Sequence, residues 1–161
     1  MASKNKNLSN YSEKNVSGMS SRVFSIVVSE WNDQVTEALY SGAHQTLLDH
    51  GVKPDNIRRV DVPGSYELPL AAQWMAKKKK IHAVICLGVV IQGETRHFEF
   101  INQAVAQGIK DVSLKYNKPV IFGVLTTDTM KQALDRAGGK HGNKGDEAAI
   151  TAIKMLSIQS K

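Results

Sequence analysis

The sequence has little of what marks disulfide-bonded, membrane-spanning or disordered proteins. Cys86 is the only cysteine among 161 residues, so a disulfide within the chain is excluded. The longest apolar run, around residues 83–91, is about half of what a helix needs to cross a bilayer. Hydrophobic residues make up 42% of the chain, charged residues 22% and aromatic residues 6%, and only four residues are proline. This composition is typical of a globular domain that buries one core.

The first twenty residues are rich in polar side chains and lack the apolar stretch of a signal peptide. We expect residues 1–20 to form a flexible N-terminal tail and residues 21–161 to form a single α/β domain. A single thiol and the lack of an apolar leader favour a reducing compartment. We therefore expect a cytoplasmic protein with no membrane partner.

The chain is basic, because its 21 Lys and Arg residues outnumber its 15 Asp and Glu residues, which gives a formal charge of +6. Nucleic-acid binding is one interpretation of such a charge. However, four of the positive charges form the run Lys77–Lys80, which has no interleaved aromatic residues to stack on bases. Lysines at the end of a helix are favoured by the helix dipole. The run therefore favours a solvated helix end, and we expect no nucleic-acid partner.

Short β-rich runs alternate with apolar residues at helical spacing along the chain. Strands are predicted at residues 22–29, 57–62, 81–91 and 119–125. Helices are predicted at residues 35–50, from 65 to about 78, through 98–112, from about 128 to 137, and at 146–158. Strands that alternate with helices imply right-handed crossovers and a parallel sheet. We therefore predict an α/β three-layer sandwich, in which a four-stranded parallel, flavodoxin-like sheet is flanked by helices on both faces.

Capping residues and glycines mark the boundaries of the predicted helices. Candidate N-caps are Asn32-Asp33 for the first helix, Ser65 for the second, and one of Thr126, Thr127 and Asp128 for the fourth. Gly51 suits the position after the first helix. Residues 138–145, GGKHGNKG, are predicted to form a flexible basic loop.

Ligands of open α/β sheets bind beyond the carboxyl ends of the strands. Here those ends carry two aromatic residues, Trp31 and Tyr66, and one histidine, His97, among capping residues. An aromatic surface beside helix N-termini suits a planar heterocycle that carries an anionic group. The alternative is that both aromatic side chains belong to the core.

Two side chains are candidates for the chemistry of such a site. His97 suits a general acid or base, because imidazole exchanges protons near neutral pH, and the alternative is a solvent-facing histidine. Arg136 suits the role of a phosphate-binding residue. The equally favoured alternative is that its charge stabilises the end of a helix through the helix dipole. Residues 88–95 superficially resemble a P-loop, but Glu94 stands where a lysine is required. The five histidines are scattered without Cys or carboxylate partners at ligand spacing, so no metal site is expected.

Five segments of the chain together define a family pattern. They are, in order, VSEWND, VPGSYELP, LGVVIQGETRHFEF, PVIFGVLTT and DRAGGKHGNKGDEAAITAIKM. In this order and spacing they resemble the lumazine synthases over about residues 22–156. The resemblance implies a transferase of riboflavin biosynthesis, which condenses 5-amino-6-(D-ribitylamino)uracil with 3,4-dihydroxy-2-butanone 4-phosphate and releases phosphate and water. It implies these small-molecule substrates, no cofactor and no metal.

The resemblance also assigns roles to residues of this chain. It implies that Trp31 stacks on the pyrimidine ring and that His97 transfers protons. The other residues implied to bind the pyrimidine and its ribityl chain are Ser65, Tyr66, Glu67, Val89, Val90, Ile91 and, from a neighbouring subunit, Phe122. Those implied to bind phosphate are Glu94, Thr95 and, from a neighbouring subunit, Arg136. Asn32 and Lys144 are implied to lie near the site.

Two residues of the turn after the third predicted strand depart from the family pattern. Gln92 stands where arginine is frequent, which removes a positive charge near the phosphate. Glu94 stands where a small residue or aspartate is frequent, and a carboxylate there would repel phosphate. We therefore expect Glu94 to bind phosphate only through its backbone.

The resemblance further implies a homo-oligomer. Members of the family form pentamers whose active sites lie at subunit interfaces, and many pack twelve pentamers into a hollow icosahedral shell of sixty subunits. Association with riboflavin synthase is the further partner that the resemblance implies. Two alternatives on the same fold are a non-catalytic lumazine- or flavin-binding protein and a structural shell protein. The binding protein can dispense with His97 and Arg136, so the presence of these residues favours the enzyme. The shell protein predicts loss of the phosphate-binding turn, which is only partly altered here.

Overall fold

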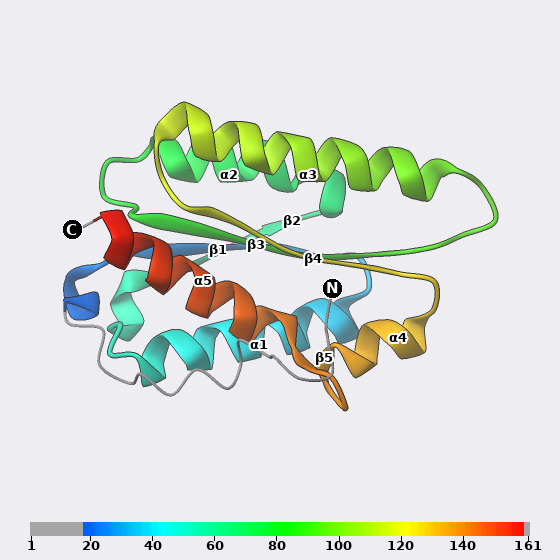
Figure 1. Ribbon diagram of the computed structural model, residues 1–161, viewed down its shortest axis with the longest axis horizontal. Coiled ribbons are helices and arrows are strands. Elements are labelled where there is room, and N and C mark those ends of the chain that lie inside the picture. Colours follow the sequence, from blue (N-terminus) through cyan, green and yellow to red (C-terminus); the bar gives the residue numbers. More distant parts are fainter. Residues whose placement is uncertain (1–17, 160–161) are drawn as a thin grey trace.

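Four parallel strands and five α-helices form three layers in the computed structural model, which describes residues 18–159 (Figure 1). The strands are β1 (Phe24–Ser29), β2 (Ile57–Val62), β3 (Ala83–Ile91) and β4 (Val120–Thr127). They form one sheet in the order β2-β1-β3-β4, and all neighbouring strands are parallel. The predicted four-stranded parallel sheet is confirmed.

Helices cover both faces of this sheet, as the strand–helix alternation predicts. On one face lie α1 (Asp33–Asp49) and α5 (Lys144–Gln159), and on the other lie α2 (Leu68–Lys77) and α3 (His97–Tyr116) (Figure 1). The short α4 (Met130–Asp135) follows β4. Three single 3₁₀ turns complete the connections: η2 (Met19–Ser21), η3 (Pro54–Asn56) and η4 (Ser65–Glu67).

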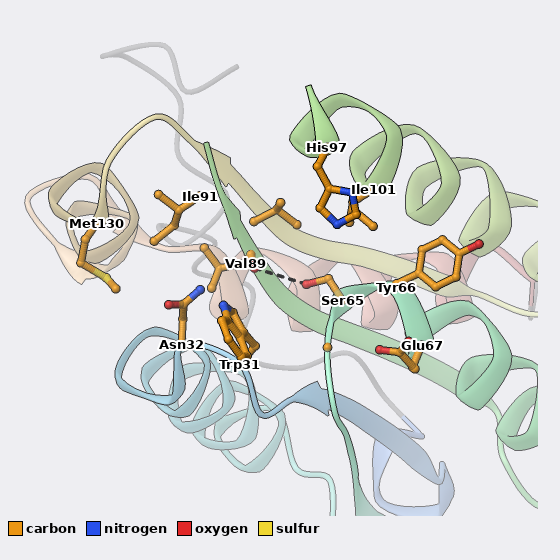
Figure 2. A pocket seen from close by; sticks show the side chains of 12 residues that line it. Trp31, Asn32, Ser65, Tyr66, Glu67, Val89, Ile91, His97, Ile101 and Met130 are labelled. Atoms are coloured by element: carbon orange, nitrogen blue, oxygen red, sulfur yellow. Dashed lines mark hydrogen bonds between the residues drawn. The ribbon is translucent and has the colours of Figure 1, made fainter. Parts of the chain in front are cut away.

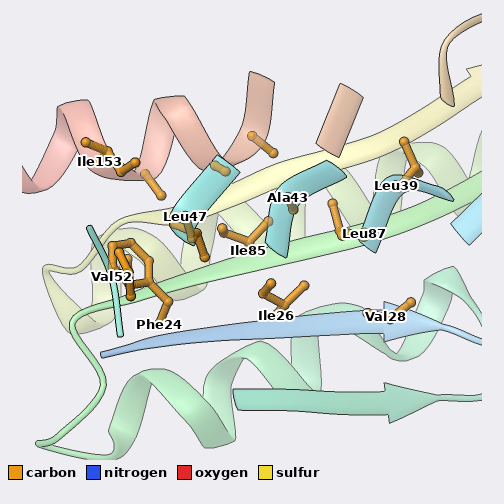
Figure 3. Close-up of a cluster of buried hydrophobic side chains, with 14 of the residues drawn as sticks. Phe24, Ile26, Val28, Leu39, Ala43, Leu47, Val52, Ile85, Leu87 and Ile153 are labelled. Atoms are coloured by element: carbon orange, nitrogen blue, oxygen red, sulfur yellow. The ribbon is translucent and has the colours of Figure 1, made fainter. Parts of the chain in front are cut away.

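The strands divide the interior into two cores, because successive side chains of a strand point to opposite faces. Residues of the core under α1 and α5 include Phe24, Ile26, Val28, Leu39, Leu47, Ile85 and Ile153 (Figure 3). Residues of the core under α2 and α3 include Val27, Leu68, Val84, Cys86, Val105 and Ile109. Complete burial raises the pKa of the Cys86 thiol to about 12, so the cysteine is an uncharged part of this core.

The packed domain extends into the segment that the sequence predicts to be a tail. Met19 of η2 is 3% exposed and joins the core under α1 and α5. Arg22, three residues further on, donates its backbone N–H to the carbonyl of Met19 at 3.0 Å. The remainder of the expected tail, residues 1–17, lies outside the described residues.

The helices end near the predicted positions, and the predicted N-caps fit in part. Asn32 is the N-cap residue of α1, as predicted, but it takes a left-handed conformation, with φ 61° and ψ 52°, and its side chain makes no capping hydrogen bond. Ser65 belongs to η4, and α2 begins three residues later at Leu68. The N-cap of α4 is Thr129, whose side chain and that of Gln132 form a reciprocal capping box. The predicted role of Gly51 fits, because it follows α1 with φ 82°.

Residues 137–143 form a hairpin and α5 begins at Lys144, so the prediction of a flexible loop over residues 138–145 is wrong. Two short antiparallel strands, β5 (Ala137–Gly139) and β6 (Gly142–Asn143), pair across a tight turn. Gly138 and Gly142 have φ of 105° and 78°, values that favour glycine. Glycine therefore serves here to shape a specific turn rather than to loosen the backbone.

Candidate active site

A cavity of about 620 Å³, called the main pocket below, opens beyond the carboxyl ends of β1, β2 and β3 (Figure 2). It lies where the strand order reverses, because β2 and β3 flank β1 on opposite sides. Open α/β sheets bind ligands at this position. The residues that line the main pocket are Trp31, Asn32, Gly64, Ser65, Tyr66, Glu67, Val89, Val90, Ile91, His97, Ile101 and Met130.

The floor of the main pocket exists because β3 reaches further than β1. The ladder between β1 and β3 ends at Leu87, whereas the ladder between β3 and β4 continues to Ile91. Beyond Leu87, the edge of β3 on the β1 side has no neighbouring strand in the part of the chain that the structure describes. The N–H and C=O groups along such an edge are available to a ligand.

One side of the main pocket is attached to β3 by Ser65. Its hydroxyl donates a hydrogen bond to the carbonyl oxygen of Val89 over 3.3 Å, and the residue is buried. The absence of a side chain at Gly88 permits this approach, because a Cβ there would lie 2.6 Å from Ser65 Oγ and 3.0 Å from Leu68 Cδ1. The hydroxyl that was expected to cap α2 therefore binds the neighbouring strand instead.

The two aromatic residues expected at the site are exposed in the chain. Trp31 is 72% exposed and Tyr66 is 59% exposed, so the alternative that they belong to the core is wrong. They reach the main pocket from different connections, Trp31 from β1–α1 and Tyr66 from β2–α2 (Figure 2). The N–H of Trp31 donates to the carbonyl of Pro63 over 3.2 Å, which ties the two connections together.

His97 is the first residue of α3, and its imidazole faces the main pocket beside Ile101 (Figure 2). Its backbone N–H donates to the hydroxyl of Thr95 over 3.4 Å. The side chain stands at the start of the long helix α3, six residues after the end of β3. This placement brings the imidazole to the wall of the main pocket.

The residues between β3 and α3 form a second cavity of about 270 Å³, called the turn cavity below. Its lining residues are Gln92, Gly93, Glu94, Thr95, Arg96, Phe98 and Glu99. Glu94 and Thr95, implied to bind phosphate, thus lie here and not in the main pocket. The guanidinium of Arg96 donates to the carboxylate of Glu99 over 2.9 Å.

Arg136 and Lys144, two further residues implied for the site, lie in a separate cluster around Glu147. Arg136 donates to the Glu147 carboxylate over 3.0 Å and to the carbonyl of His141 over 2.6 Å. Lys144 donates to the other carboxylate oxygen of Glu147 over 3.1 Å. Within one chain, neither cation lines the main pocket or the turn cavity.

Most of the residues that the sequence assigned to the site come together in one chain. Trp31, Asn32, Ser65, Tyr66, Glu67, Val89, Val90, Ile91 and His97 line the main pocket, while Phe122, Glu94, Thr95, Arg136 and Lys144 do not. Phe122 is a half-buried residue of β4 that packs against the core under α2 and α3. The residues that sequence reasoning missed are Gly64, Ile101 and Met130. The helical spacing of Ile101 from His97, one turn apart on α3, was a usable signal, whereas Met130 had none.

Within residues 18–159, no group of three or more His, Cys, Asp or Glu side chains is placed to hold a metal ion. In the same range, no helix is both long and apolar enough to cross a membrane.

Fold and pocket together define an α/β protein with a cavity at the carboxyl edge of a parallel sheet, lined by two exposed aromatic side chains and a histidine. The chain belongs to the 6,7-dimethyl-8-ribityllumazine synthase family, whose sequence model matches residues 21–160. The resemblance drawn from the five sequence segments is confirmed. The family is one of enzymes, so the enzyme interpretation is also confirmed.

Several relatives of this chain are named 6,7-dimethyl-8-ribityllumazine synthase, and the matches cover most or all of each relative. The 6,7-dimethyl-8-ribityllumazine synthase of Cytophaga hutchinsonii is 66% identical over 157 residues, which cover 98% of each chain. That of Parabacteroides distasonis is 51% identical over 160 residues, covering 99% of this chain and 100% of the relative. That of Flavobacterium johnsoniae is 51% identical over 161 residues, covering 100% and 85%.

Proposed function

We propose that the main pocket and the turn cavity are the active site in which this chain makes 6,7-dimethyl-8-ribityllumazine, a step of riboflavin biosynthesis. The substrates are 5-amino-6-(D-ribitylamino)uracil and 3,4-dihydroxy-2-butanone 4-phosphate, and the other products are phosphate and water. One observation carries the proposal: an exposed indole, an imidazole and the free edge of β3 face one cavity (Figure 2). These are the groups needed to stack a pyrimidine, hydrogen-bond its edge and move protons beside it.

The pyrimidine binds between Trp31 and the free edge of β3. An indole stacks on a planar heterocycle with little dependence on its substituents, whereas backbone groups recognise its polar edge. Val89, Val90 and Ile91 occupy the part of β3 that β1 does not pair with. Successive residues of a strand point their backbone groups to opposite edges, and the N–H of Gln92 donates to Thr127 beyond β3 on the β4 side. The backbone groups of Val89 and Ile91 therefore point to the free edge, which supports their role as hydrogen-bonding groups for the ring, while Val90 bounds the pocket. Asn32 extends this surface from the start of α1.

The ribityl chain lies along Ser65, Tyr66 and Glu67. The Tyr66 hydroxyl and the Glu67 carboxylate are polar groups that suit a polyhydroxy chain. Because the hydroxyl of Ser65 already donates to Val89, Ser65 acts mainly by holding this wall against β3. Tyr66 and Glu67 therefore contact the ribityl chain, and Ser65 positions them.

Proton transfer during imine formation and dehydration is the task of His97. Imidazole suits this task because it exchanges protons near neutral pH. The substrate amine is already nucleophilic, so no activated Ser, Cys or Lys is required. Holding two reactants in neighbouring cavities supplies much of the acceleration, because the reaction then becomes effectively unimolecular.

The phosphate group lies in the turn cavity at the backbone of Glu94 and Thr95. A turn that leads into a long helix offers N–H groups and the positive end of the helix dipole. Arg136 and Phe122 complete the site from a neighbouring subunit, with Lys144 close by. Their position outside both cavities of their own chain supports this assignment.

A site shared in this way requires a homo-oligomer, and we propose a pentamer that packs further into an icosahedral shell. Large apolar side chains outside the main pocket are exposed in the single chain, and such surfaces mark protein interfaces. They include Leu70, Trp74, Phe100, Leu114 and Ile158. Sedimentation should give a particle of at least five times the 17.7 kDa chain mass, and a monomer would contradict the shared site. We further expect the assembly to work in the cytoplasm with riboflavin synthase as a partner.

A two-substrate assay tests the proposed function. The purified protein is mixed with both substrates, and lumazine absorbance and phosphate release are followed together. We expect lumazine and phosphate in equal amounts, at a rate well above that of the uncatalysed mixture. Binding of lumazine without acceleration would instead favour a non-catalytic binding protein.

A further inference from the structure

The turn cavity and the main pocket are formed by neighbouring segments of the chain. Residues 92–99, which include all the residues that line the turn cavity, begin directly after Ile91 and include His97, and both of these residues line the main pocket. In the proposed function the butanone phosphate reacts near His97 with its phosphate in the turn cavity. The charge of that cavity then decides how well the phosphate binds.

The side chains of the turn cavity carry more negative than positive charge. Glu94 and Glu99 each contribute a carboxylate, and Arg96 contributes a guanidinium. Of the arginine and lysine side chains in residues 18–159, Arg96 alone lines this cavity. Without Arg96, a phosphate dianion would meet two carboxylates and no cation from its own chain, which is electrostatically unfavourable.

Arg136, which is assigned to the phosphate, and Lys144, which is assigned near the site, are already engaged within their own chain. Arg136 and Lys144 both donate to Glu147, and the Arg136 and Glu147 side chains are only 18% and 12% exposed. Arg96, by contrast, is 81% exposed and is bound only at the surface, to Glu99 three residues further along α3. Exposed ion pairs of this kind contribute little to stability, so an incoming anion can replace Glu99 at small cost.

We propose that Arg96 binds the phosphate group of the butanone substrate in the turn cavity, an inference that rests on the proposed function. The guanidinium leaves Glu99 and donates two parallel N–H bonds to phosphate oxygens, the geometry for which arginine is suited. The amide of Gln92, which faces the same cavity, is a further neutral donor. Arg96 thus supplies in this turn the positive charge that Gln92 does not.

Steady-state kinetics of Arg96→Gln test the proposal. We expect the KM for the butanone phosphate to rise about tenfold or more, because a charge-assisted bond to phosphate is lost. The KM for the ribitylaminouracil should stay unchanged, and inorganic phosphate should become a weaker competitive inhibitor by a similar factor. Arg58→Gln is the matched control, since Arg58 is an exposed arginine near the amino end of β2, at the opposite edge of the sheet.

Two further variants distinguish binding of phosphate by Arg96 from a purely structural role of this residue. Gln92→Arg in the Arg96→Gln background returns a cation to the turn cavity and should recover most of the lost affinity. Glu99→Gln removes the competing carboxylate and should lower the KM for the butanone phosphate, with no change in the melting temperature beyond that of Arg58→Gln. If Gln92→Arg did not restore the affinity for the butanone phosphate in the Arg96→Gln background, the role of Arg96 through its charge would be contradicted.

Calorimetric titration with the butanone phosphate distinguishes this inference from the proposed function. If wild-type protein made no lumazine, the proposed function would fail, and the titration would still decide the role of Arg96. Binding that is weakened about tenfold in Arg96→Gln supports the inference. Equal binding by wild type and variant, or no binding by either, overturns it.

Discussion

The Ser65 hydroxyl and the Val89 carbonyl oxygen lie 3.3 Å apart, and their hydrogen bond joins η4 to the free edge of β3. Both residues line the main pocket, so this bond sets the distance between the wall that carries Tyr66 and Glu67 and the floor that β3 provides. Gly88 lies directly beneath it, without a side chain that would separate the two elements. The shape of the pocket therefore depends on a glycine that does not line it.

Gly88→Ala should widen this separation and weaken binding of the ribitylaminouracil. The added methyl group would contact Ser65 Oγ and Leu68 Cδ1, and the resulting overpacking should cost about 1–3 kcal/mol of stability. We expect a raised KM for the pyrimidine substrate together with a lowered melting temperature.

Gly123→Ala is the control for Gly88→Ala, because a Cβ at Gly123 would lie 2.7 Å from Leu87 Cδ2 and 2.9 Å from the carbonyl of Cys86. It should lower the melting temperature while leaving the KM for the pyrimidine close to that of wild type. If both variants shifted the KM equally, the bond between Ser65 and Val89 would have no special role.

Trp31→Ala should weaken binding of the pyrimidine and of lumazine by about 1–3 kcal/mol, the range for aromatic stacking on a base. Folding stability should change little, because the side chain is 72% exposed. Trp31→Phe should retain most of the affinity, since it keeps a stacking surface. Fluorescence of Trp31 in a Trp74→Phe background reports the contact directly, and an emission that lumazine leaves unquenched would contradict it.

Mixing of inactive subunits tests whether sites are shared between chains. Arg136→Ala should chiefly raise the KM for the butanone phosphate, and His97→Ala should lower kcat. Subunits of the two variants, unfolded together and reassembled, should regain activity, because some sites then combine an intact His97 with an intact Arg136 from a neighbour. Activity of the mixture that equals the sum of the separate variants would show that each site uses one chain only.

Acidification should destabilise the chain through His82. Its Nδ1 accepts a hydrogen bond from the backbone N–H of Val23 over 2.9 Å, a bond that protonation removes. Burial, with smaller effects from the positive charges of Arg22 and Lys118, lowers the pKa of His82 below its usual value of 6.5. The unfolded chain therefore binds this proton more readily than the folded chain does, and stability falls as the pH drops below 6.5 toward the lowered pKa.

Melting temperatures between about pH 7.5 and about pH 5.5 measure this effect. His82→Gln keeps a hydrogen-bond acceptor but cannot titrate, so its melting temperature should fall less steeply over this interval than that of wild type. Equal slopes for the two proteins would assign the acid sensitivity to other groups.

Much of the fold could be predicted from the sequence, because each element is marked by its own periodicity. The apolar runs that became β1 and β3 are buried along nearly their whole length, as strands covered on both faces must be. Helix caps were less predictable, since a hydroxyl has several partners within reach. Ser65 donates to Val89, 24 residues away, and no local pattern reveals that competition.

The site was predictable where its residues follow strands, and less so where it depends on distant packing. Trp31, Tyr66 and His97 lie in the first few residues after strands whose carboxyl ends meet at one edge, so sheet topology brings them together. Met130 reaches the main pocket from α4, about one hundred residues beyond Trp31, and its spacing carries no signal. The hairpin of residues 137–143 escaped prediction because its glycines fit both a loop and a tight turn.

The central claim is that the main pocket is where this chain makes lumazine, and kinetics of His97→Ala test it most directly. In the two-substrate assay, kcat should fall by about 10²–10⁴, the usual share of a general acid or base. Lumazine should still bind to the variant as it does to wild type, because stacking on Trp31 and the edge of β3 are intact. His44→Ala, a histidine of α1 that lines neither cavity, should keep wild-type kinetics. Wild-type turnover by His97→Ala would contradict the account.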